Sequence, residues 1–547
     1  MICDVNLLPV GEPLFSNLRE LGQVYVDKTD LIYNIAIQRG PIFFARPRRF
    51  GKSLLLNTFK SLFSTGLNDF KGLAIEKYWH DKTYKVVHID FSRMADDDTN
   101  DLIYKLSEKL IREFKVNDTV SLYDAGGKVK SPDIILDQIC EKLNNYSIVL
   151  LIDEYDAPLV HHIDDNNQLS GILKTLRSFY STVKEHTGKF RFIFITGVTR
   201  ISHLSIFSAF NNLKDLSFVK EYNTLLGFTQ NDLVKFFDLY IENAANILHM
   251  SKDSVYARLE DYYDGFKFVP DADETLYNPW SILRFLNYPI DRFMNYWFKS
   301  GGTPSIIMQY LKVKDYFDYI VYSDREICID INKLSDCYEI ENIPAEILLC
   351  QAGYFSPYAQ NDGSIILRPP NSEVEDSLLR LYLTANNVKE NNDLRSKRQT
   401  LVADIDAHNL KNIVDTFNTI LNTVVSNNSK IFEDERSVRD IIFASILLVR
   451  DLEKFKEKYT LKGFADLELT TKRTHLVIEF KRTYPRDKNN PKNHPRDAKK
   501  ALDLAIEQIK THDYGKIIFE TQTLYRVAMV ISTEEKRILY EYCQEVS

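Results

Sequence analysis

Lys52 and Ser53, together with the glycine before them, form a short sequence whose chemistry suits the binding of a phosphate group. An apolar run at residues 42–44 precedes them and a run of helical periodicity follows, so we expect a strand, a loop and a helix across residues 41–56. Backbone N–H groups at a helix N-terminus hold a phosphate, a lysine there reaches the β- and γ-phosphates, and a serine hydroxyl ligates Mg²⁺. Arg46 stands where the full pattern G-x-x-x-x-G-K-[ST] has its first glycine, so a surface turn is the alternative interpretation.

An acidic pair, Asp153 and Glu154, follows five consecutive apolar residues at 148–152. Such a run predicts a strand buried on both faces of a parallel sheet, and ligands bind at the carboxyl ends of such strands. Asp153 would support a bound Mg²⁺ and Glu154 would polarise the attacking water. A helix N-cap is the alternative for an acidic pair alone, but combined with Lys52 and Ser53 the pair favours a nucleotide hydrolase.

The surrounding chain alternates between the two kinds of periodicity, which predicts an α/β fold with a parallel sheet and helices on both faces. The strands are expected at residues 85–91 and 190–196, and the helices at 101–114, 132–143 and 168–186. Thr196 ends the last of these strands. That strand lies beside the acidic strand if the sheet has the order of P-loop ATPases in which the acidic strand is displaced from the loop strand. Thr196 would then sense the γ-phosphate, and Arg200 would stabilise transition-state charge in cis or in trans. A helix cap and a surface charge are the alternatives for these two residues.

Composition narrows the class of protein. A length of 547 residues predicts about three or four domains, and no apolar run approaches the ~20 residues that span a bilayer, so we expect a cytoplasmic protein without a membrane partner. The six cysteines are scattered without a CxxC pair, which argues against a disulfide framework or a zinc site. The net charge of −8 argues against a protein that coats nucleic acid with its whole surface, yet residues 481–500 hold eight basic and two acidic side chains.

Five separated motifs occur in order in the first half of the chain: YVDKT, RPRRFGKS, LLIDEYDAP, FITGVTRIS and FSAFNNLKDLS. This combination resembles the AAA-ATPase-like family of bacterial and archaeal proteins, in which arginine often takes the place that Arg46 has here. The resemblance implies ATP rather than GTP, with Mg²⁺, and a helical or winged-helix lid after the sheet. The ATP-binding residues predicted on this basis are Arg46, Arg48, Arg49, Phe50, Gly51, Lys52, Ser53, Asp153, Thr196 and Arg200, with Glu154 as the catalytic residue and Ser53 and Asp153 at the metal.

A second set of chemical groups lies near the C-terminus, on two predicted strands at residues 463–470 and 475–481. Side chains alternate along a strand, so Glu479 and Lys481 point to one face. If the hairpin is symmetric about the bond between residues 472 and 473, Asp466 faces Glu479, with Cβ atoms about 4.5–5.5 Å apart. Two carboxylates at this distance repel, so either a divalent metal binds between them or one stays protonated. A surface hairpin with alternating charges is the alternative.

An Asp followed by Glu-x-Lys on the next strand resembles the PD-(D/E)xK nuclease superfamily, whose domains often follow ATPases of the family named above. The resemblance implies that Asp466 and Glu479 bind Mg²⁺ or Mn²⁺, with the Phe480 carbonyl as a further ligand, and that Lys481 orients or activates the attacking water. Glu435 matches the helical glutamate of the superfamily, a further metal ligand. Gln508 and Tyr514 resemble its supporting Q…Y pattern.

Taken together, the sequence predicts an α/β protein in which a P-loop ATPase controls a metal-dependent nuclease that acts on nucleic acid, with DNA as the expected polymer. The alternative is an ATP-switched module that binds nucleic acid or protein through an inactive nuclease fold. A homo-oligomer and a role in defence or in a mobile element are allowed by analogy only. The predicted parts are the ATPase at residues 1–225, a helical lid at 226–313, a mostly helical connector at 314–430 with helices around a polar turn at 360–363, and the nuclease-like domain at 431–547.

Overall fold

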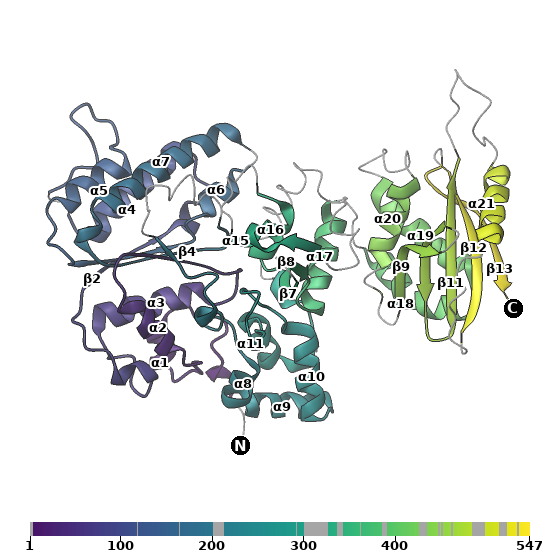
Figure 1. Cartoon of the computed structure of the whole chain (residues 1–547), viewed down its shortest axis with the longest axis horizontal. Helices are drawn as coiled ribbons and strands as arrows, with labels where there is room; N and C mark the ends of the chain where they lie inside the picture. Colours follow the sequence, from purple (N-terminus) through teal and green to yellow (C-terminus); the bar gives the residue numbers. More distant parts are fainter. Residues whose placement is uncertain are drawn as a thin grey trace. The chain divides into compact units, whose positions relative to one another are not determined.

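The computed structural model groups the chain into two compact units, drawn in Figure 1. The first unit consists of Met1–Tyr316 and Ser323–Ser377, and the second of Phe317–Tyr322 and Leu378–Ser547. The structure describes residues 4–116, 119–163, 165–200, 213–291, 293–299, 327–335, 343–361, 363–385, 391–425, 435–446, 449, 452–460, 463–483, 498–512, 522–532 and 535–546.

A five-stranded parallel sheet forms the centre of the first unit. Its strands are β1 (Pro41–Ala45), β2 (Lys85–Asp90), β3 (Ile148–Asp153), β4 (Phe190–Gly197) and β5 (Lys214–Asp215), in the order β2-β3-β4-β1-β5. Every pairing is parallel. Strands β1, β3 and β4 are buried along their whole length, which is why they are almost uninterrupted apolar runs in the sequence. Strand β4 lies between the loop strand β1 and the acidic strand β3, so the strand order on which the role of Thr196 depended is present.

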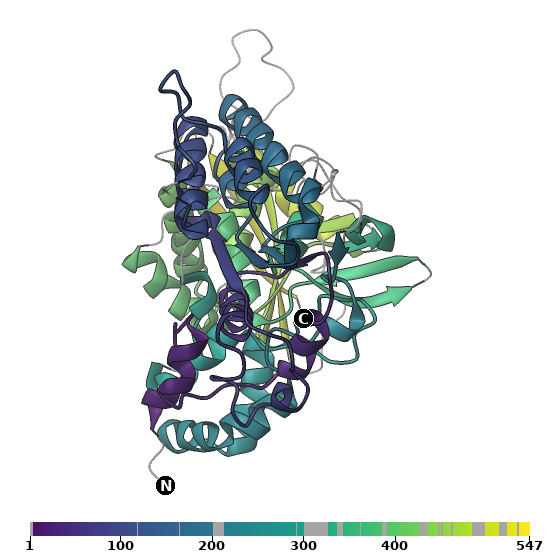
Figure 2. The same cartoon turned by 90° about the vertical axis from the view of Figure 1, so that its left-hand side faces the viewer.

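Helices cover both faces of this sheet, as Figures 1 and 2 show. Helices α4 (Thr99–Phe114), α5 (Pro132–Cys140) and α7 (Asn166–Glu185) lie side by side over one face, with the short α6 (Ala157–His161) beside them. Helix α3 (Lys52–Thr65) lies on the other face, with α1 (Phe15–Glu20) and α2 (Thr29–Ala36) beyond it. The side chains of Asp98 and Asp165 accept backbone N–H groups in the first turns of α4 and α7, which explains where these two helices begin. The parallel α/β fold predicted from the sequence is confirmed for this unit.

A helical subdomain follows the sheet. It consists of α8 (Gln230–Asp232), a π-helical turn (Leu233–Phe237), α9 (Asp238–Leu248), α10 (Lys252–Tyr263), α11 (Pro279–Asn287) and the short α12 (Tyr296–Lys299). A capping box between Thr229 and Asp232 sets its first turn. Its aromatic side chains, such as Tyr263, Phe285 and Phe293, pack on one another and form its core. We call residues 225–299 the lid.

The region from β6 (Ile327–Asp330) to β8 (Ser364–Arg368) contains a small antiparallel sheet in the order β6-β8-β7, where β7 is Ser356–Asn361. Helices α15 (Ile331–Ser335) and α16 (Ala345–Gln351) lie in the same region. The expectation of helices around the polar residues 360–363 was therefore wrong, because strand β7 ends at Asn361 and strand β8 begins at Ser364; Figure 2 shows the ribbons of both strands. The alternation of buried and half-buried residues along β8 gives the physical reason, since a two-residue period belongs to a strand.

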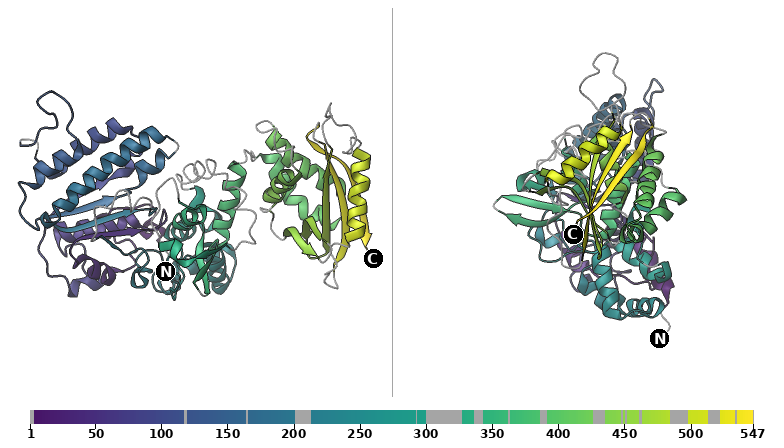
Figure 3. Two further views of the ribbon diagram at one scale, coloured as in Figure 1. Left: turned by 45° about the horizontal axis from the view of Figure 1, so that its top comes forward. Right: turned by 90° about the vertical axis from the view of Figure 1, so that its right-hand side faces the viewer.

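The second unit contains a mixed five-stranded sheet in the order β13-β12-β11-β10-β9. Its strands are β9 (Glu453–Thr460), β10 (Gly463–Thr470), β11 (Thr474–Arg482), β12 (Thr523–Ser532) and β13 (Arg537–Val546). Strands β11 and β12 pair in parallel and the other neighbours are antiparallel. Helices α18 (Asn392–Asp406), α19 (Leu410–Val425) and α20 (Glu435–Ile446) share a large apolar core with one face, and α21 (Ala498–His512) packs on the other, as Figure 3 shows.

Helix α17 (Ser372–Ala385) begins in the first unit, and its residues from Leu378 onward are grouped with the second. Among the described residues, no helix is both long enough and apolar enough to cross a membrane.

Candidate functional site

The turn between β1 and α3 has the backbone shape that a phosphate-holding loop needs. Arg49 and Gly51 both have left-handed backbone conformations, with φ of 68° and 96°. Such a conformation is easily adopted by glycine, and the Gly51 carbonyl accepts the Leu55 N–H at 3.0 Å, which begins α3 directly after the turn. In an α-helix the N–H groups of the first turn, here those of Lys52 and Ser53, have no carbonyl partner within the helix. An anion can therefore bind them.

Four polar side chains from two distant motifs meet at this turn. The Ser53 hydroxyl donates to Asp153 Oδ2 at 2.8 Å, and the Glu154 N–H donates to Asp153 Oδ1 at 3.0 Å. Lys52 is only 6% exposed, and its ammonium donates to the Pro47 carbonyl at 3.0 Å. Burial lowers the pKa of Lys52 while the nearby carboxylates oppose this, and burial raises the pKa of Asp153 to about 6. A hydroxyl beside a carboxylate at the end of a phosphate loop is an oxygen donor set that fits Mg²⁺.

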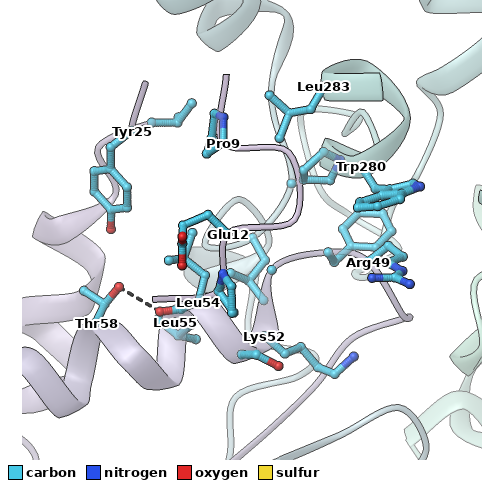
Figure 4. A pocket seen from close by; sticks show the side chains of 18 of the residues that line it. Pro9, Glu12, Tyr25, Arg49, Lys52, Leu54, Leu55, Thr58, Trp280 and Leu283 are labelled. Atoms are coloured by element: carbon cyan, nitrogen blue, oxygen red, sulfur yellow. Dashed lines mark hydrogen bonds between the residues drawn. The ribbon is translucent and has the colours of Figure 1, made fainter. Parts of the chain in front are cut away.

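A cavity of about 410 Å³ adjoins the loop, and Figure 4 shows its side chains. One side is polar and contains the loop and Glu154. The other side is formed by the N-terminal segment around Pro9 and by Trp280 and Leu283 of the lid. The apolar residues that line the cavity are Pro9, Pro13, Leu18, Val24, Val26, Ile32, Phe50, Leu54, Leu55, Leu225, Leu226, Phe228, Pro279, Trp280 and Leu283. A pocket with a cationic, N–H-rich end and an apolar end suits a nucleotide, whose phosphates and base have these two characters.

Among the arginines of the loop, Arg48 and Arg49 line the cavity, and the Arg49 guanidinium lies over the Trp280 ring at 4.5 Å. Arg46 has a different environment. Its side chain is 2% exposed and donates to the carbonyls of Ala45, Ser217 and Tyr222 at 2.9–3.1 Å.

The Arg46 guanidinium also lies between the Phe44 and Phe268 rings, and burial lowers its pKa to about 9. Arg46 is not among the described residues that line the cavity, so its hydrogen bonds stabilise the loop from the side away from the cavity. Phe50 lines the cavity, but its ring packs edge-on against Phe266 and Phe268 and joins the loop to the lid.

Thr196 and Arg200 lie beside β1 and β5 rather than among the described lining residues. The Thr196 hydroxyl is buried and donates to the Phe44 carbonyl at 2.7 Å. The Arg200 side chain is also buried, forms an ion pair with Asp215 at 2.7 Å and donates to the Leu334 carbonyl at 3.0 Å. Both groups therefore bind other parts of the first unit.

Sequence reasoning missed one carboxylate in the acidic motif. Asp156 is 3% exposed and accepts the N–H groups of Val198 and Thr199 and the Thr199 hydroxyl. Asp156 thereby fixes residues 198 and 199, which follow β4, next to the C-terminal end of β3. Its position in LLIDEYD, three residues after Asp153, was the available signal. Another missed contact joins Lys28, from YVDKT, to Asp232 of the lid at 2.6 Å.

In the second unit, the hairpin between β10 and β11 has the predicted register. Leu467 pairs with Ile478 and Glu468 with Val477, so the next pair in the same register is Asp466 with Glu479. One Asp466 oxygen accepts the Phe480 N–H at 2.8 Å and the other accepts from Arg439 of α20 at 3.3 Å.

The second carboxylate of that hairpin also has a cationic neighbour. Glu479 is 2% exposed and forms an ion pair with Lys481 at 2.8 Å. Burial raises the pKa of Asp466, although the cations and the Phe480 N–H oppose this. The structure thus brings Asp466, Glu479 and Lys481 together at one end of the hairpin.

The other residues predicted for this site lie around it or outside the described chain. Glu435 is the first residue of α20, but its side chain is outside the described part. Gln508 lies on α21, which packs over the same sheet face as Glu479, whereas Tyr514 and most of the basic segment fall outside the described residues. No cluster of three or more His, Cys, Asp or Glu side chains suited to a metal ion occurs within the part of the chain that the structure describes.

The fold and the site of the first unit define a P-loop type of nucleotide-binding protein: a parallel sheet, a lysine and a serine at the start of the helix after β1, and an acidic strand displaced by one position. Residues 9–207 match the AAA-ATPase-like family, described as "Predicted AAA-ATPase". A protein of Azotobacter chroococcum mcd 1, described as "Uncharacterized protein in vnfD 5'region", is 30% identical over 378 residues, which cover 68% of this chain and 69% of that protein. The chain therefore belongs to the AAA-ATPase-like family.

Proposed function

We propose that the first unit binds ATP with Mg²⁺ and hydrolyses it. The observation that carries this proposal is the meeting of Lys52, Ser53, Asp153 and Glu154 at the polar end of a cavity of about 410 Å³. These groups come from two motifs about a hundred residues apart, and the parallel sheet brings them together because the carboxyl ends of its strands lie at one edge. Membership of a predicted ATPase family supports the same conclusion.

Each group has a role that its position allows. The Lys52 ammonium leaves the Pro47 carbonyl and binds a β- or γ-phosphate oxygen, a better partner because it is anionic. Ser53 and Asp153 would hold a Mg²⁺ ion, which would supply neutralisation of phosphate charge, and Glu154 would accept a hydrogen bond from the attacking water. The base lies at the apolar end, between the N-terminal segment and the lid residues Trp280 and Leu283.

A binding and turnover assay tests this proposal. Because Trp280 lines the cavity, ATP should change the tryptophan fluorescence of the wild type, and Lys52→Ala should weaken binding at least tenfold. Glu154→Gln should bind ATP normally and lose most of the turnover. Lys60→Ala, on the same helix but not among the lining residues, is the control. Equal ATP affinity of the wild type and Lys52→Ala would contradict the proposal.

For the second unit, we propose a metal-dependent nuclease that cleaves nucleic acid, with DNA as the polymer. Support comes from the register of β10 and β11, which places Asp466 opposite Glu479 with Lys481 next to them. A divalent ion between the carboxylates would relieve their repulsion and activate a water, which Lys481 would orient. We further propose that the nucleotide state of the first unit controls this site.

A specific observation favours a second candidate, a binding module without cleavage. Arg439 and Lys481 already form ion pairs with Asp466 and Glu479, at 3.3 Å and 2.8 Å. Both carboxylates are thus balanced by protein cations, and a metal would have to displace at least one of these pairs. In this alternative, ATP would switch the binding of DNA or of a protein partner.

Cleavage assays separate the two candidates. Plasmid, linear and single-stranded DNA are incubated with Mg²⁺ or Mn²⁺, with and without ATP, for the wild type, Asp466→Ala, Lys52→Ala and the control Asp503→Ala. Asp503 is exposed on α21, so its loss should leave cleavage unchanged. Cleavage that Asp466→Ala abolishes and Lys52→Ala alters supports the ATP-controlled nuclease. Metal-independent binding without cleavage supports the binding module.

A further inference from the structure

The phosphate loop is held by a side chain from the far end of the lid. The Trp297 indole N–H donates to the Arg48 carbonyl at 3.3 Å, and the indole ring packs on Tyr354 with centroids 4.9 Å apart. A second contact comes from Gly353, where an added Cβ would lie 2.8 Å from the Pro47 ring. The loop is therefore packed against Trp297 and Gly353, which sequence motifs did not identify.

A buried carboxylate fixes Trp297 in turn. Glu373 is 1% exposed and accepts the backbone N–H groups of Tyr296 and Trp297 at 2.7 and 2.9 Å through one oxygen. Its other oxygen accepts the Ser281 hydroxyl of α11 at 2.7 Å. Asn295 reinforces this contact, because its side-chain amide donates to the Glu373 carbonyl at 3.0 Å. A carboxylate that receives three hydrogen bonds from two lid elements determines where Trp297 lies.

Glu373 is the second residue of α17, the helix whose later residues, from Leu378 onward, are grouped with the second unit. One continuous set of contacts thus runs from the loop carbonyl at Arg48, through Trp297, to the first turn of this helix. Two hydrogen bonds, one to each end of Trp297, therefore join the loop to Glu373 on this helix.

We propose that Trp297 and Glu373 are positioning residues that tie the phosphate loop to α17, so that ATP binding changes the stability of that helix. This inference rests on the proposed binding of ATP. When phosphates bind the loop, Lys52 leaves the Pro47 carbonyl and the backbone around Arg48 adjusts. The Trp297 bond transmits this adjustment to Glu373, because the indole ring, confined by Tyr354, moves with its backbone. The position of the lid and the conformation of the loop then depend on each other. The lid position and the loop conformation of the ATP-bound state therefore stabilise one another.

The test uses the full-length protein and the substitution Trp297→Phe, which keeps an aromatic ring and removes the indole N–H. The control is Trp79→Phe, the same substitution at a buried tryptophan that packs on Phe63. ATP affinity is measured by calorimetry, and hydrogen exchange of residues 372–385 is measured with and without ATP. Loss of one hydrogen bond predicts an ATP dissociation constant about fivefold higher for Trp297→Phe and unchanged for Trp79→Phe.

In the wild type, ATP should slow exchange in residues 372–385, and Trp297→Phe should lose this effect while keeping its fold. Glu373→Ala should behave like Trp297→Phe, and Glu373→Gln should restore the effect, because an amide oxygen still accepts both N–H groups. A merely structural role would lower stability without abolishing the response to ATP. Normal affinity and a normal exchange response in Trp297→Phe would overturn the inference. If the wild type fails to bind ATP at all, the proposed ATPase function fails, and this inference fails with it.

Discussion

Replacing Glu373 by glutamine should remove a pH dependence from the stability of the first unit. Burial raises the pKa of Glu373 to about 7 from 4.5, with a smaller contribution from Asp376. The folded state therefore binds a proton that the unfolded chain has already released between these two values. The resulting stability is fully present below pH 4.5 and is lost as the pH rises through about 7. Between pH 5 and pH 8 the loss comes to about 2.5 kcal/mol, from a folded pKa near 7 and an unfolded pKa near 4.5.

Glutamine is the appropriate replacement because it matches the protonated acid in shape and charge. Its amide oxygen accepts the Tyr296 and Trp297 N–H groups, and its NH₂ group donates to the Ser281 hydroxyl. All three tryptophans of the chain lie in the first unit, so their fluorescence in urea reports the unfolding of that unit. Glu375→Gln, on the same helix and half-buried, removes an equal charge and serves as control.

Unfolding free energies at pH 5, 6, 7 and 8 give the result. Glu373→Gln should match the wild type near pH 5 and exceed it by about 2.5 kcal/mol at pH 8, because only the wild type must then hold a buried charge. The control should follow the wild type throughout. A constant difference between the wild type and Glu373→Gln over this range would refute the reasoning, since Glu373 would then keep one protonation state in the folded protein.

Three further substitutions test other assignments. Thr196→Val should cost about 1–2 kcal/mol in urea unfolding, because the Phe44 carbonyl loses its donor, while ATP turnover stays within about threefold. A tenfold loss of turnover at unchanged stability would restore the phosphate-sensing role. Gly353→Ala should destabilise the first unit by about 1–3 kcal/mol, because the φ of Gly353 is 88° and a Cβ would approach Pro47 to 2.8 Å. A decrease in unfolding free energy below about 0.5 kcal/mol would contradict this. Arg46→Lys should lower the unfolding free energy by at least about 2 kcal/mol, because an ammonium cannot reproduce the planar guanidinium that binds three carbonyls. Weaker ATP binding at unchanged stability would instead indicate that Arg46 contacts the nucleotide.

Local patterns in the sequence were sufficient to predict the helices and strands that carry the nucleotide site. The helix predicted after the loop begins at Lys52, and the buried acidic strand ends at Asp153. The register of the β10–β11 hairpin was also predictable, because alternation and a symmetric turn leave one pairing that buries the apolar face. The antiparallel sheet at 327–368 was missed, although the alternation along β8 was readable.

The sequence by itself thus determined the motifs, their elements and the meeting of Ser53 with Asp153, because these depend on hydrophobic periodicity and on strand ends that a parallel sheet gathers at one edge. Only the tertiary structure decided what surrounds them. Two of the three carbonyls that Arg46 binds belong to Ser217 and Tyr222, more than 170 residues away, and Glu373 accepts the N–H of Trp297, 76 residues earlier in the sequence. Packing brings such partners together. A charged side chain that is buried in this way is costly unless it forms hydrogen bonds, and no local sequence pattern encodes the distant residues that provide them.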